Sequence, residues 1–346
     1  MDLLHPYLFI IMEQTSPKKR IEYIDLMKGV CITLVVLFHV INNTTIEIID
    51  NALTNIRMPL YFFLSGLFFK KYTGFKDFAV RKTNKLIIPY LFFALVPFCL
   101  LAPLFREDFK EPTFYLMAII RPYNGPLWFL RCLFLTYIIY YAFKLLTDRL
   151  SKLLQIFIII AITVIVWLIS LYFREHHFSE DYQTLNHLTT NTLLCPFMAL
   201  PFMYVAEWVR TNNILNKELS VKQQILFFII SASVFVLLAQ PHVYFEGALY
   251  GDIYPLTYIS AFSGIYALAI VCKRIKKLFF FSYIGRYSLI VLGTHWAYLL
   301  AIRGVVDIRQ TFQFLLILAL MPPTIWFFKK FFPYFTAQKD LFKYKS

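Results

Sequence analysis

The chain has 346 residues, of which 59% are hydrophobic and 16% are charged, and its mean hydropathy is +0.63. A soluble domain cannot bury so much apolar surface, because soluble chains are about half apolar and a quarter charged. The net charge of +14 would suit a nucleic-acid-binding protein. The basic residues, however, lie in short loops between apolar segments, which membrane topology explains without nucleic acid. The composition therefore predicts an all-α, polytopic membrane protein.

Ten apolar segments are predicted to cross the membrane, because about 20 apolar residues in a helix span a ~30 Å hydrocarbon core. They are residues 24–43, 56–69, 86–105, 126–146, 153–173, 188–209, 223–240, 253–272, 279–301 and 311–332. The second segment is short and contains Pro59 and Gly66, which predicts a tilted or broken helix. We find no pair of matching broken segments of the kind that marks many transporters.

The basic residues alternate between successive loops. The N-terminal segment and every second loop after it together hold 24 Lys and Arg. The loops between them together hold 6. Because cytoplasmic loops carry the excess of Lys and Arg, this alternation predicts an even number of spans with both termini in the cytoplasm. The chain then divides into a cytoplasmic segment at 1–20, in which Met12 is an alternative start, a transmembrane domain at 21–332 and a basic cytoplasmic tail at 333–346.

The first span carries a lysine and a histidine eleven residues apart, Lys28 and His39. In a helix this spacing is about 20° past three full turns and about 16 Å along the axis, so both side chains share one face. Ionisable groups inside a membrane face a bundle interior or a wet cavity and are functional candidates. His39 is a candidate general base toward a hydroxyl; the alternative is a hydrogen bond to a neighbouring helix. Lys28 either contacts phosphate or extends to the membrane surface beside Asp25.

Several polar residues are predicted on the same outer side of the membrane as His39, and Arg57 at about the same depth. Arg57 opens the second span and either anchors a headgroup or stabilises an oxyanion. Trp128 opens the fourth span and suits either an interfacial position or sugar stacking. Arg131, a turn further in, needs a partner because a charge at this depth is costly. His295 approaches the outer face near the end of the ninth span.

The remaining candidates lie on the predicted cytoplasmic side. Arg81, Lys82 and Lys85 precede the third span on the same side as Lys28, where an anionic donor would bind, although the topology rule alone would also place them there. Asp25, Arg286 and Glu207 are predicted to be structural residues or counter-ions. All five cysteines fall in apolar runs without metal-binding spacing, so we predict no metal site.

Together these residues resemble the acyltransferase-3 family of integral-membrane O-acyltransferases, over residues 20–332. The resemblance lies in four segments: Tyr23 to His39, Met58 to Gly66, Leu127 to Leu130 and Ile284 to His295. The first is the most specific, because the family's signature is a basic residue, ten further residues and a histidine in the first helix. Here Lys28 stands where the family usually has arginine. The family's paired-arginine motif before the third helix is imperfect, since Arg81 is followed three residues later by Asn84.

The resemblance implies a ten-helix bundle that moves an acyl group, usually acetyl, from cytosolic acyl-CoA to a hydroxyl of a sugar or lipid-linked glycan. It implies no permanently bound cofactor, a multi-pass location in a bacterial plasma membrane, and His39 as the essential histidine. Our hypothesis is that His39 deprotonates the acceptor or relays the acyl group, and that Arg57 stabilises negative charge. Trp128, Arg131 and His295 would line the acceptor side, and Lys28, Arg81, Lys82 and Lys85 would bind the donor.

Two other functions are compatible with a polytopic bundle that contains buried charges. One is an exporter or flippase of a polysaccharide or lipid-linked intermediate, and the other is a structural subunit of an envelope-polysaccharide assembly. An exporter predicts a cavity open alternately to each side and no dependence on acyl-CoA. The lysine and histidine on one face of the first span favour the enzyme over both alternatives.

Overall fold

The computed structural model describes residues 21–41, 47–101, 124–175 and 189–343, and these ranges are almost entirely helical. The α-helices are α2 (Glu22–Val40), α3 (Glu47–Leu67), α4 (Phe75–Lys82), α5 (Ile88–Leu101), α7 (Trp128–Thr147), α8 (Lys152–Glu175), α10 (Cys195–Met198), α11 (Leu200–Thr211), α12 (Val221–Leu237), α13 (Tyr254–Ile275), α14 (Phe279–Arg286), α15 (Ser288–Val305) and α16 (Gln310–Phe331). The π- and 3-10 helices are η1 (Thr83–Ile87), η4 (Gly125–Leu127), η6 (Thr189–Leu194), η7 (Ile214–Asn216) and η8 (Phe245–Gly247), and the strands are β1 (Val243–Tyr244) and β2 (Leu249–Tyr250).

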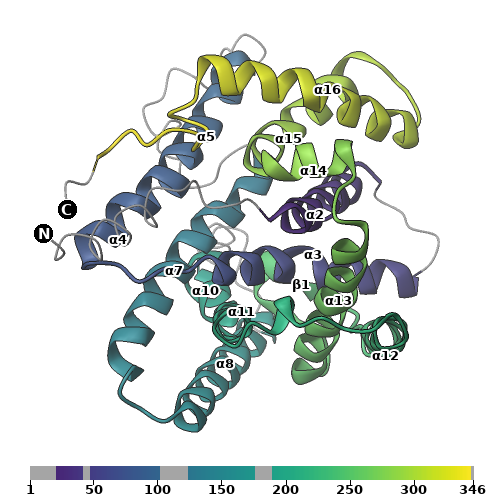
Figure 1. Cartoon of the computed structure of the whole chain (residues 1–346). Helices are drawn as coiled ribbons and strands as arrows, with labels where there is room; N and C mark the ends of the chain where they lie inside the picture. The colour runs from purple at the N-terminus through teal and green to yellow at the C-terminus, as the bar shows by residue number, and fades with distance from the viewer. Residues whose placement is uncertain (1–20, 42–46, 102–123, 176–188, 344–346) are drawn as a thin grey trace, which may run out of the picture.

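Helix α2 lies near the middle of the bundle, whereas α8, α12 and α16 lie at its outside (Figure 1). The pattern of burial agrees with this arrangement. More than half of the apolar stretch of α2 is buried, but in α12 Ser231 is the one buried residue. A helix that is apolar all round and yet exposed on most sides is what a lipid environment stabilises. The first predicted span is therefore the central helix of the bundle.

Seven helices in the described ranges are long and apolar enough to cross a membrane. This confirms an all-α, multi-pass membrane protein. The segments predicted at 56–69, 86–105 and 223–240 overlap α3, α5 and α12, which do not meet both criteria, and residues 102–105 lie outside the described residues. Helix α3 begins at Glu47, earlier than predicted, and contains Pro59; α12 has 17 residues. The count of ten spans and the side of each terminus remain predictions.

Two of the predicted spans are interrupted. The ninth segment forms two helices, α14 and α15, that are separated at Tyr287, whose φ of −116° and ψ of 29° leave the helical region. The sixth segment runs through η6, α10 and α11, where Pro196 and Pro201 stand at the starts of α10 and α11. Proline lacks the backbone N–H that a continuous helix needs. The sequence pattern did not indicate these breaks.

Helices α2 and α14 pack backbone to backbone through two glycines. A Cβ atom built on Gly29 would lie 1.8 Å from the carbonyl oxygen of Phe281, and one built on Gly285 would lie 1.9 Å from the carbonyl oxygen of Asp25. No side chain can be accommodated at such distances, so only glycine permits this contact. The contact fixes the N-terminal half of α2, which carries Lys28, against the C-terminal third of the chain.

The hairpin of β1 and β2 packs against α3. Val243 pairs with Tyr250 in antiparallel register. The side chain of Asn55 on α3 donates to the carbonyl of Gln240 at 2.9 Å, and the side chain of Gln240 accepts from the backbone N–H of Ile253 at 3.1 Å. These bonds hold the segment before and after the hairpin on α3. They bring residues 242–246 close to Arg57 in the middle of α3.

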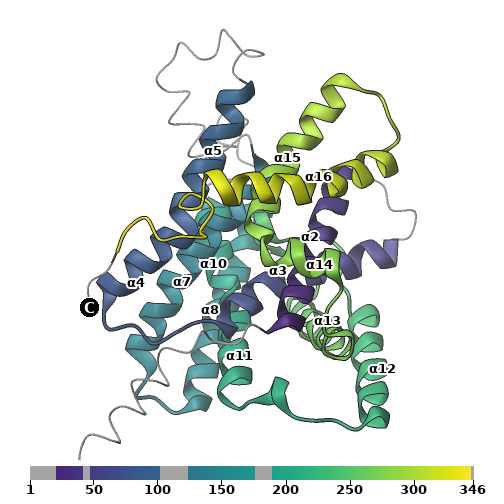
Figure 2. The same cartoon turned by 45° about the horizontal axis from the view of Figure 1, so that its top comes forward.

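The C-terminal segment after α16 folds back beside α4, as the yellow trace in Figure 2 shows. The side chain of Asn84 in η1 donates to the carbonyl of Phe342 at 2.8 Å and accepts from the backbone N–H groups of Leu341 and Phe342, both at 2.9 Å. Lys85 adds a hydrogen bond to the carbonyl of Ala337 at 2.9 Å. The predicted basic tail is thus tied to the segment that leads into α5.

Candidate active site

A cavity of about 260 Å³ contains His39, and we call it the histidine cavity. Helices α2 and α3, the start of α7 and the hairpin segment surround it. Its lining residues are Val35, Phe38, His39, Asn51, Thr54, Arg57, Met58, Trp128, His242, Val243, Tyr244, Phe245 and Glu246. It therefore combines a titratable ring, a guanidinium, aromatic rings and hydroxyl, amide and carboxylate groups, which is the composition expected of a site that orients a polar ligand.

The ring of His39 contacts three other aromatic rings. Phe38 and Trp296 contact its ring edge to face, with centroid distances of 5.2 Å each. The ring of His295 lies on another side, with a centroid distance of 5.4 Å and an interplanar angle of 36°. These contacts come from α2 and α15, so the orientation of His39 depends on how those two helices pack. The structure brings together the two histidines that the sequence placed in separate spans.

Arg57 is buried in the wall of the histidine cavity, with an exposed fraction of 6%. Its guanidinium lies 4.1 Å from the centre of the Phe38 ring, and its Nη2 atom donates to the Thr54 hydroxyl at 2.5 Å. The carbonyl oxygen of Arg57 accepts a hydrogen bond from the Cys31 thiol at 2.9 Å, which joins α3 to α2. The cation is therefore fixed beside the residue that precedes His39, as an oxyanion-stabilising group must be.

Trp128 lines the histidine cavity from the first turn of α7. The residue before η4, Asn124, donates through its side chain to the carbonyl of Gly293 at 2.7 Å. This bond ties the start of α7 to α15, the helix that carries His295. Trp128 lies in the same cavity as His39 and Arg57.

Residues 242–246 also line the histidine cavity, and the sequence analysis did not single them out. Tyr244 donates to the Glu246 carboxylate at 3.0 Å, and His242 lies 3.2 Å from Asp252. The signal was a run of aromatic and titratable residues in a loop that holds no Lys or Arg. These residues follow neither a helical nor a strand periodicity, so the sequence could not indicate that the loop folds onto α3.

A second cavity, of about 420 Å³, contains Lys28, and we call it the lysine cavity. Its lining residues are Lys28, Tyr61, Leu64, Ser65, Phe68, Lys85, Leu86, Phe129, Leu130, Leu133, Tyr137, Ser288, Leu289 and Leu292. Lys28 lies over the Phe68 ring at 5.2 Å, and Lys85 forms an ion pair with Asp340 at 2.9 Å. Two ammonium groups and several hydroxyl groups therefore meet in a largely apolar cavity, where they could hold the phosphates of a ligand with an apolar arm.

Lys82 lies next to the lysine cavity, above the ring of Tyr137, which lines it; the Nζ atom is 3.2 Å from the ring centre. Burial, assisted by the charge of Lys70, lowers the pKa of Lys82 to about 7. Arg81 points elsewhere: it is paired with Asp77 at 2.5 Å, and its side chain is 55% exposed. The hydrogen bond from Arg81 holds the pKa of Asp77 below its usual range. Of these two cations, Lys82 is the one that lies against the lining of the lysine cavity.

The two cavities follow one another along the same three helices. On α2, Lys28 lines the lysine cavity and His39 the histidine cavity. On α3, Arg57 and Met58 line the histidine cavity, whereas Tyr61, Leu64 and Ser65 line the lysine cavity. On α7 the boundary falls between Trp128 and Phe129. The Phe129 ring packs against Tyr61 at 5.6 Å. The predicted alignment of Lys28 and His39 thus corresponds to two consecutive cavities, and this aromatic contact belongs to the lining of the lysine cavity, next to the boundary.

Two residues predicted for the acceptor side lie outside the lining of both cavities. His295 is completely buried, behind His39 as seen from the histidine cavity. Arg131 interacts with Tyr90 of α5, which supplies the partner that the sequence analysis required. Unlike Trp128, neither residue therefore lines the cavity in which an acceptor was predicted to bind.

The three predicted structural residues are found in different surroundings. Glu207 pairs with Lys144 at 3.6 Å and with Arg210 at 3.5 Å, and the Tyr140 hydroxyl donates to it. Asp25 is buried on α2, where its backbone meets Gly285. Arg286 is exposed at the end of α14, with its guanidinium 5.4 Å from the centre of the Tyr287 ring.

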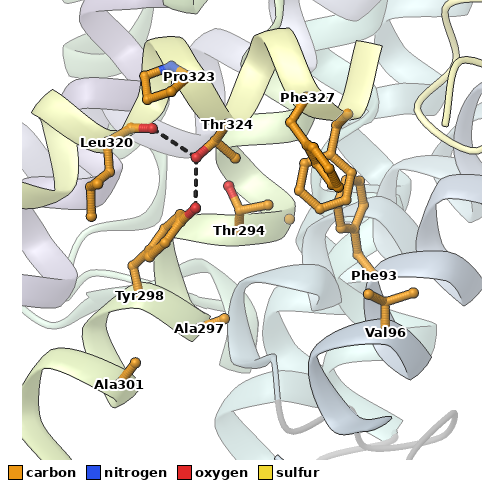
Figure 3. A pocket seen from close by; sticks show the side chains of 12 residues that line it. Phe93, Val96, Thr294, Ala297, Tyr298, Ala301, Leu320, Pro323, Thr324 and Phe327 are labelled. Atoms are coloured by element: carbon orange, nitrogen blue, oxygen red, sulfur yellow. Dashed lines mark hydrogen bonds between the residues drawn. The ribbon is translucent and has the colours of Figure 1, made fainter. Parts of the chain in front are cut away.

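A third cavity, of about 540 Å³, lies between α5, α15 and α16 (Figure 3). Phe93 and Phe327 line one side of it, and no charged side chain lines it. Its hydroxyl groups bond internally: Tyr298 donates to Thr324, which donates to the carbonyl of Leu320, both at 2.7 Å. It therefore suits hydrocarbon and has no group for catalysis. Within the described ranges, no three His, Cys, Asp or Glu side chains gather as a metal site would require.

One comparison with known proteins is informative. A family model described as an acyltransferase domain, that of the acyltransferase-3 family, matches residues 21–329. The match covers nearly the whole chain and contains every residue of the two cavities. Searches of curated proteins and of solved structures gave no significant match.

Proposed function

The chain belongs to the acyltransferase-3 family and is a membrane acyltransferase, and we propose that it moves an acetyl group from cytosolic acetyl-CoA to a hydroxyl of a cell-envelope sugar or lipid-linked glycan. The observation that carries this proposal is the placement of Lys28 and His39 in two consecutive cavities along α2. Membership of the family favours the enzyme over the exporter, because it assigns the bundle to acyl transfer rather than to transport.

The lysine cavity supports acyl-CoA as the donor. Lys28 and Lys85 supply positive charge for phosphates, and Lys82 lies beside them. The lysine ammonium group is a point charge that can bind phosphate from several directions. The apolar remainder of the cavity suits a pantetheine arm, which would extend along α2 for about 16 Å toward His39. The thioester must pass Tyr61 and Phe129 to arrive there. Their ring contact would open for the donor.

The histidine cavity supports the transfer step. A ring nitrogen of His39 takes the proton of the acceptor hydroxyl while the hydroxyl oxygen attacks the thioester carbonyl carbon. Arg57 stabilises the negative charge that develops on the carbonyl oxygen. The carbon–sulfur bond then breaks, and the CoA sulfur leaves and receives the proton from His39. The products are an O-acyl ester and CoA thiol, and His39 returns to its starting state.

The remaining groups of the histidine cavity support a carbohydrate acceptor. Trp128 and Tyr244 present aromatic rings, which pack on the apolar faces of sugars. Asn51, Thr54 and Glu246 supply hydrogen-bonding groups for hydroxyls. Such a mixture of flat apolar and polar groups fits a sugar better than a purely hydrocarbon acceptor. The proposed location is the plasma membrane of a bacterium, with the lysine cavity toward the cytoplasm and the histidine cavity toward the envelope.

The test is acyl transfer from radiolabelled acetyl-CoA into glycans of membrane vesicles that contain the wild-type protein or its His39→Ala variant. We expect the wild type to label the glycans and the variant to lose about 10²- to 10⁴-fold in rate, the usual contribution of a general base. Protein levels and thermal unfolding in detergent serve as the folding control. Equal labelling by the two proteins at equal levels would contradict the role of His39, and labelling by neither would contradict the proposed donor or acceptor.

A further inference from the structure

His295 lies behind His39 and is sealed from solvent. Its exposed fraction is 0%, and it lines neither cavity. It comes from the middle of α15, and its ring contacts that of His39 with a centroid distance of 5.4 Å. A completely buried imidazole in contact with a candidate general base is an unusual arrangement, because a polar ring is costly to bury unless its nitrogens are used.

One nitrogen of His295 is used within its own helix. The Nδ1 atom lies 2.9 Å from the carbonyl oxygen of Val291. A carbonyl oxygen can only accept, so Nδ1 must carry the hydrogen. In the neutral ring this leaves a lone pair on Nε2. Among the described residues, none hydrogen-bonds that buried Nε2 atom. The helix thus presents an acceptor with no hydrogen bond to any of those residues, inside the protein and on a ring that contacts the ring of His39.

We infer that the Nε2 atom of His295 accepts a hydrogen bond from a ring N–H of His39, directly or through one water, during acyl transfer. The inference rests on the proposed function. The ring contact leaves room for either form of the bond. Because the bond assigns the hydrogen of His39 to one nitrogen, the other nitrogen keeps its lone pair and faces the acceptor hydroxyl. His295 is a positioning residue that acts through His39.

This bond would contribute at two stages. In the resting enzyme it selects the tautomer of His39 that can act as a base, while Phe38 and Trp296 restrict the tilt of its ring. When His39 has taken the proton of the acceptor, the bond becomes charge-assisted and stronger. His295 keeps its own Nδ1 hydrogen on Val291 throughout and takes no proton itself. The effect belongs to the transition state, so it is expected in kcat rather than in KM.

Two substitutions of nearly equal size separate this role from simple packing. His295→Asn places an amide near the position of Nδ1 and keeps a donor for Val291, but it has no acceptor near Nε2. His295→Gln places its amide near Nε2 and keeps an acceptor for His39, but it loses the bond to Val291. We expect the Asn variant to lose about ten- to a hundredfold in kcat, with KM for acetyl-CoA unchanged. We expect the Gln variant to stay within about threefold of the wild type.

The opposite order, with the Asn variant active and the Gln variant impaired, would overturn the inference and leave His295 as a packing residue. Equal activities of the two variants, whether high or low, would also overturn it, because the acceptor would then not matter. If the Asn variant fails to accumulate, His295→Phe replaces it, since phenylalanine fills the ring volume without an acceptor, and the same loss is expected.

A second measurement tests whether His295 acts through His39. In the His39→Ala background, His295→Asn is expected to cause no further loss, because the residue that it positions is absent. An additional tenfold loss there would overturn the inference. Wild-type protein that transfers no acetyl group would overturn the proposed function, and this inference with it. Active wild type with the wrong order of variants would overturn this inference alone.

Discussion

The two cavities along α2 differ in how their charged groups are held. In the histidine cavity, Arg57 is buried, bonded to Thr54 and packed over the Phe38 ring. In the lysine cavity, Lys85 is 48% exposed and pairs with Asp340, which is itself 52% exposed. The first cation cannot move without disturbing α2 and α3, whereas the second can exchange its carboxylate for another anion.

This difference matches two different tasks. A group that stabilises a transition state must be fixed in advance, because reorganisation at the moment of reaction costs catalytic rate. A group that captures a phosphate from water needs only charge within reach. Exposed ion pairs contribute about 0–1 kcal/mol, so Lys85 can release Asp340 at little cost. We therefore expect changes in the histidine cavity to alter kcat, and changes in the lysine cavity to alter KM for the donor.

Among the cations of the two cavities, Arg57 should cause the largest loss of activity when it is replaced. Arg57→Ala is expected to lower kcat by about 10²- to 10³-fold, the cost of removing one oxyanion-stabilising donor, with a small change in KM. Arg57→Lys is the matched control: it keeps the charge but loses the bond to Thr54, so an intermediate kcat is expected. Steady-state kinetics with saturating acceptor measure both. An Ala variant with normal kcat and a raised KM would erase the distinction between the cavities.

Lys28 should show the opposite pattern. Lys28→Ala is expected to raise KM for acetyl-CoA roughly tenfold, the loss of one charge-assisted contact, while kcat changes little. Lys28→Arg should keep or lower KM, because a guanidinium grips phosphate at two points. Lys330→Ala is the control, since Lys330 lies over Trp326 outside both cavities. A Lys28→Ala variant that loses kcat at unchanged KM would place Lys28 in the chemistry instead of in donor binding.

The central helix and its two cavities could be anticipated from the sequence to different degrees. The apolar run with Lys28 and His39 on one face indicates a helix from the local sequence alone. The two ends of α2 were therefore predicted within a few residues. The breaks at Tyr287 and in the sixth segment were not predicted, because apolar length carries no information about a change in helix direction. Gly29 and Gly285 show the cause for one of them: they allow α14 to cross α2 at backbone contact.

The positions of the site residues could also be predicted from the sequence to different degrees. His39, Arg57 and Trp128 were predicted on the same side of the membrane, and the structure places all three in the lining of one cavity. His295 was predicted on that side as well, but only the packing of α15 on α2 shows that it meets the His39 ring rather than the cavity. The hairpin residues 242–246 reach the cavity through bonds from Asn55 and Gln240. Such long-range bonds leave no local pattern in the sequence.

Lys82 gives the smallest expected effect and tests the lysine cavity by pH. Burial and the neighbouring charge of Lys70 lower its pKa to about 7, so its positive charge is present below pH 7 and is lost as pH rises through that value. If Lys82 assists donor binding, KM for acetyl-CoA should rise by up to about fivefold between pH 6 and pH 8. Lys82→Arg should remove this dependence, because arginine stays charged throughout. The same rise in the Arg variant would assign it to another group, such as the phosphates of the donor, and would leave Lys82 outside the binding site.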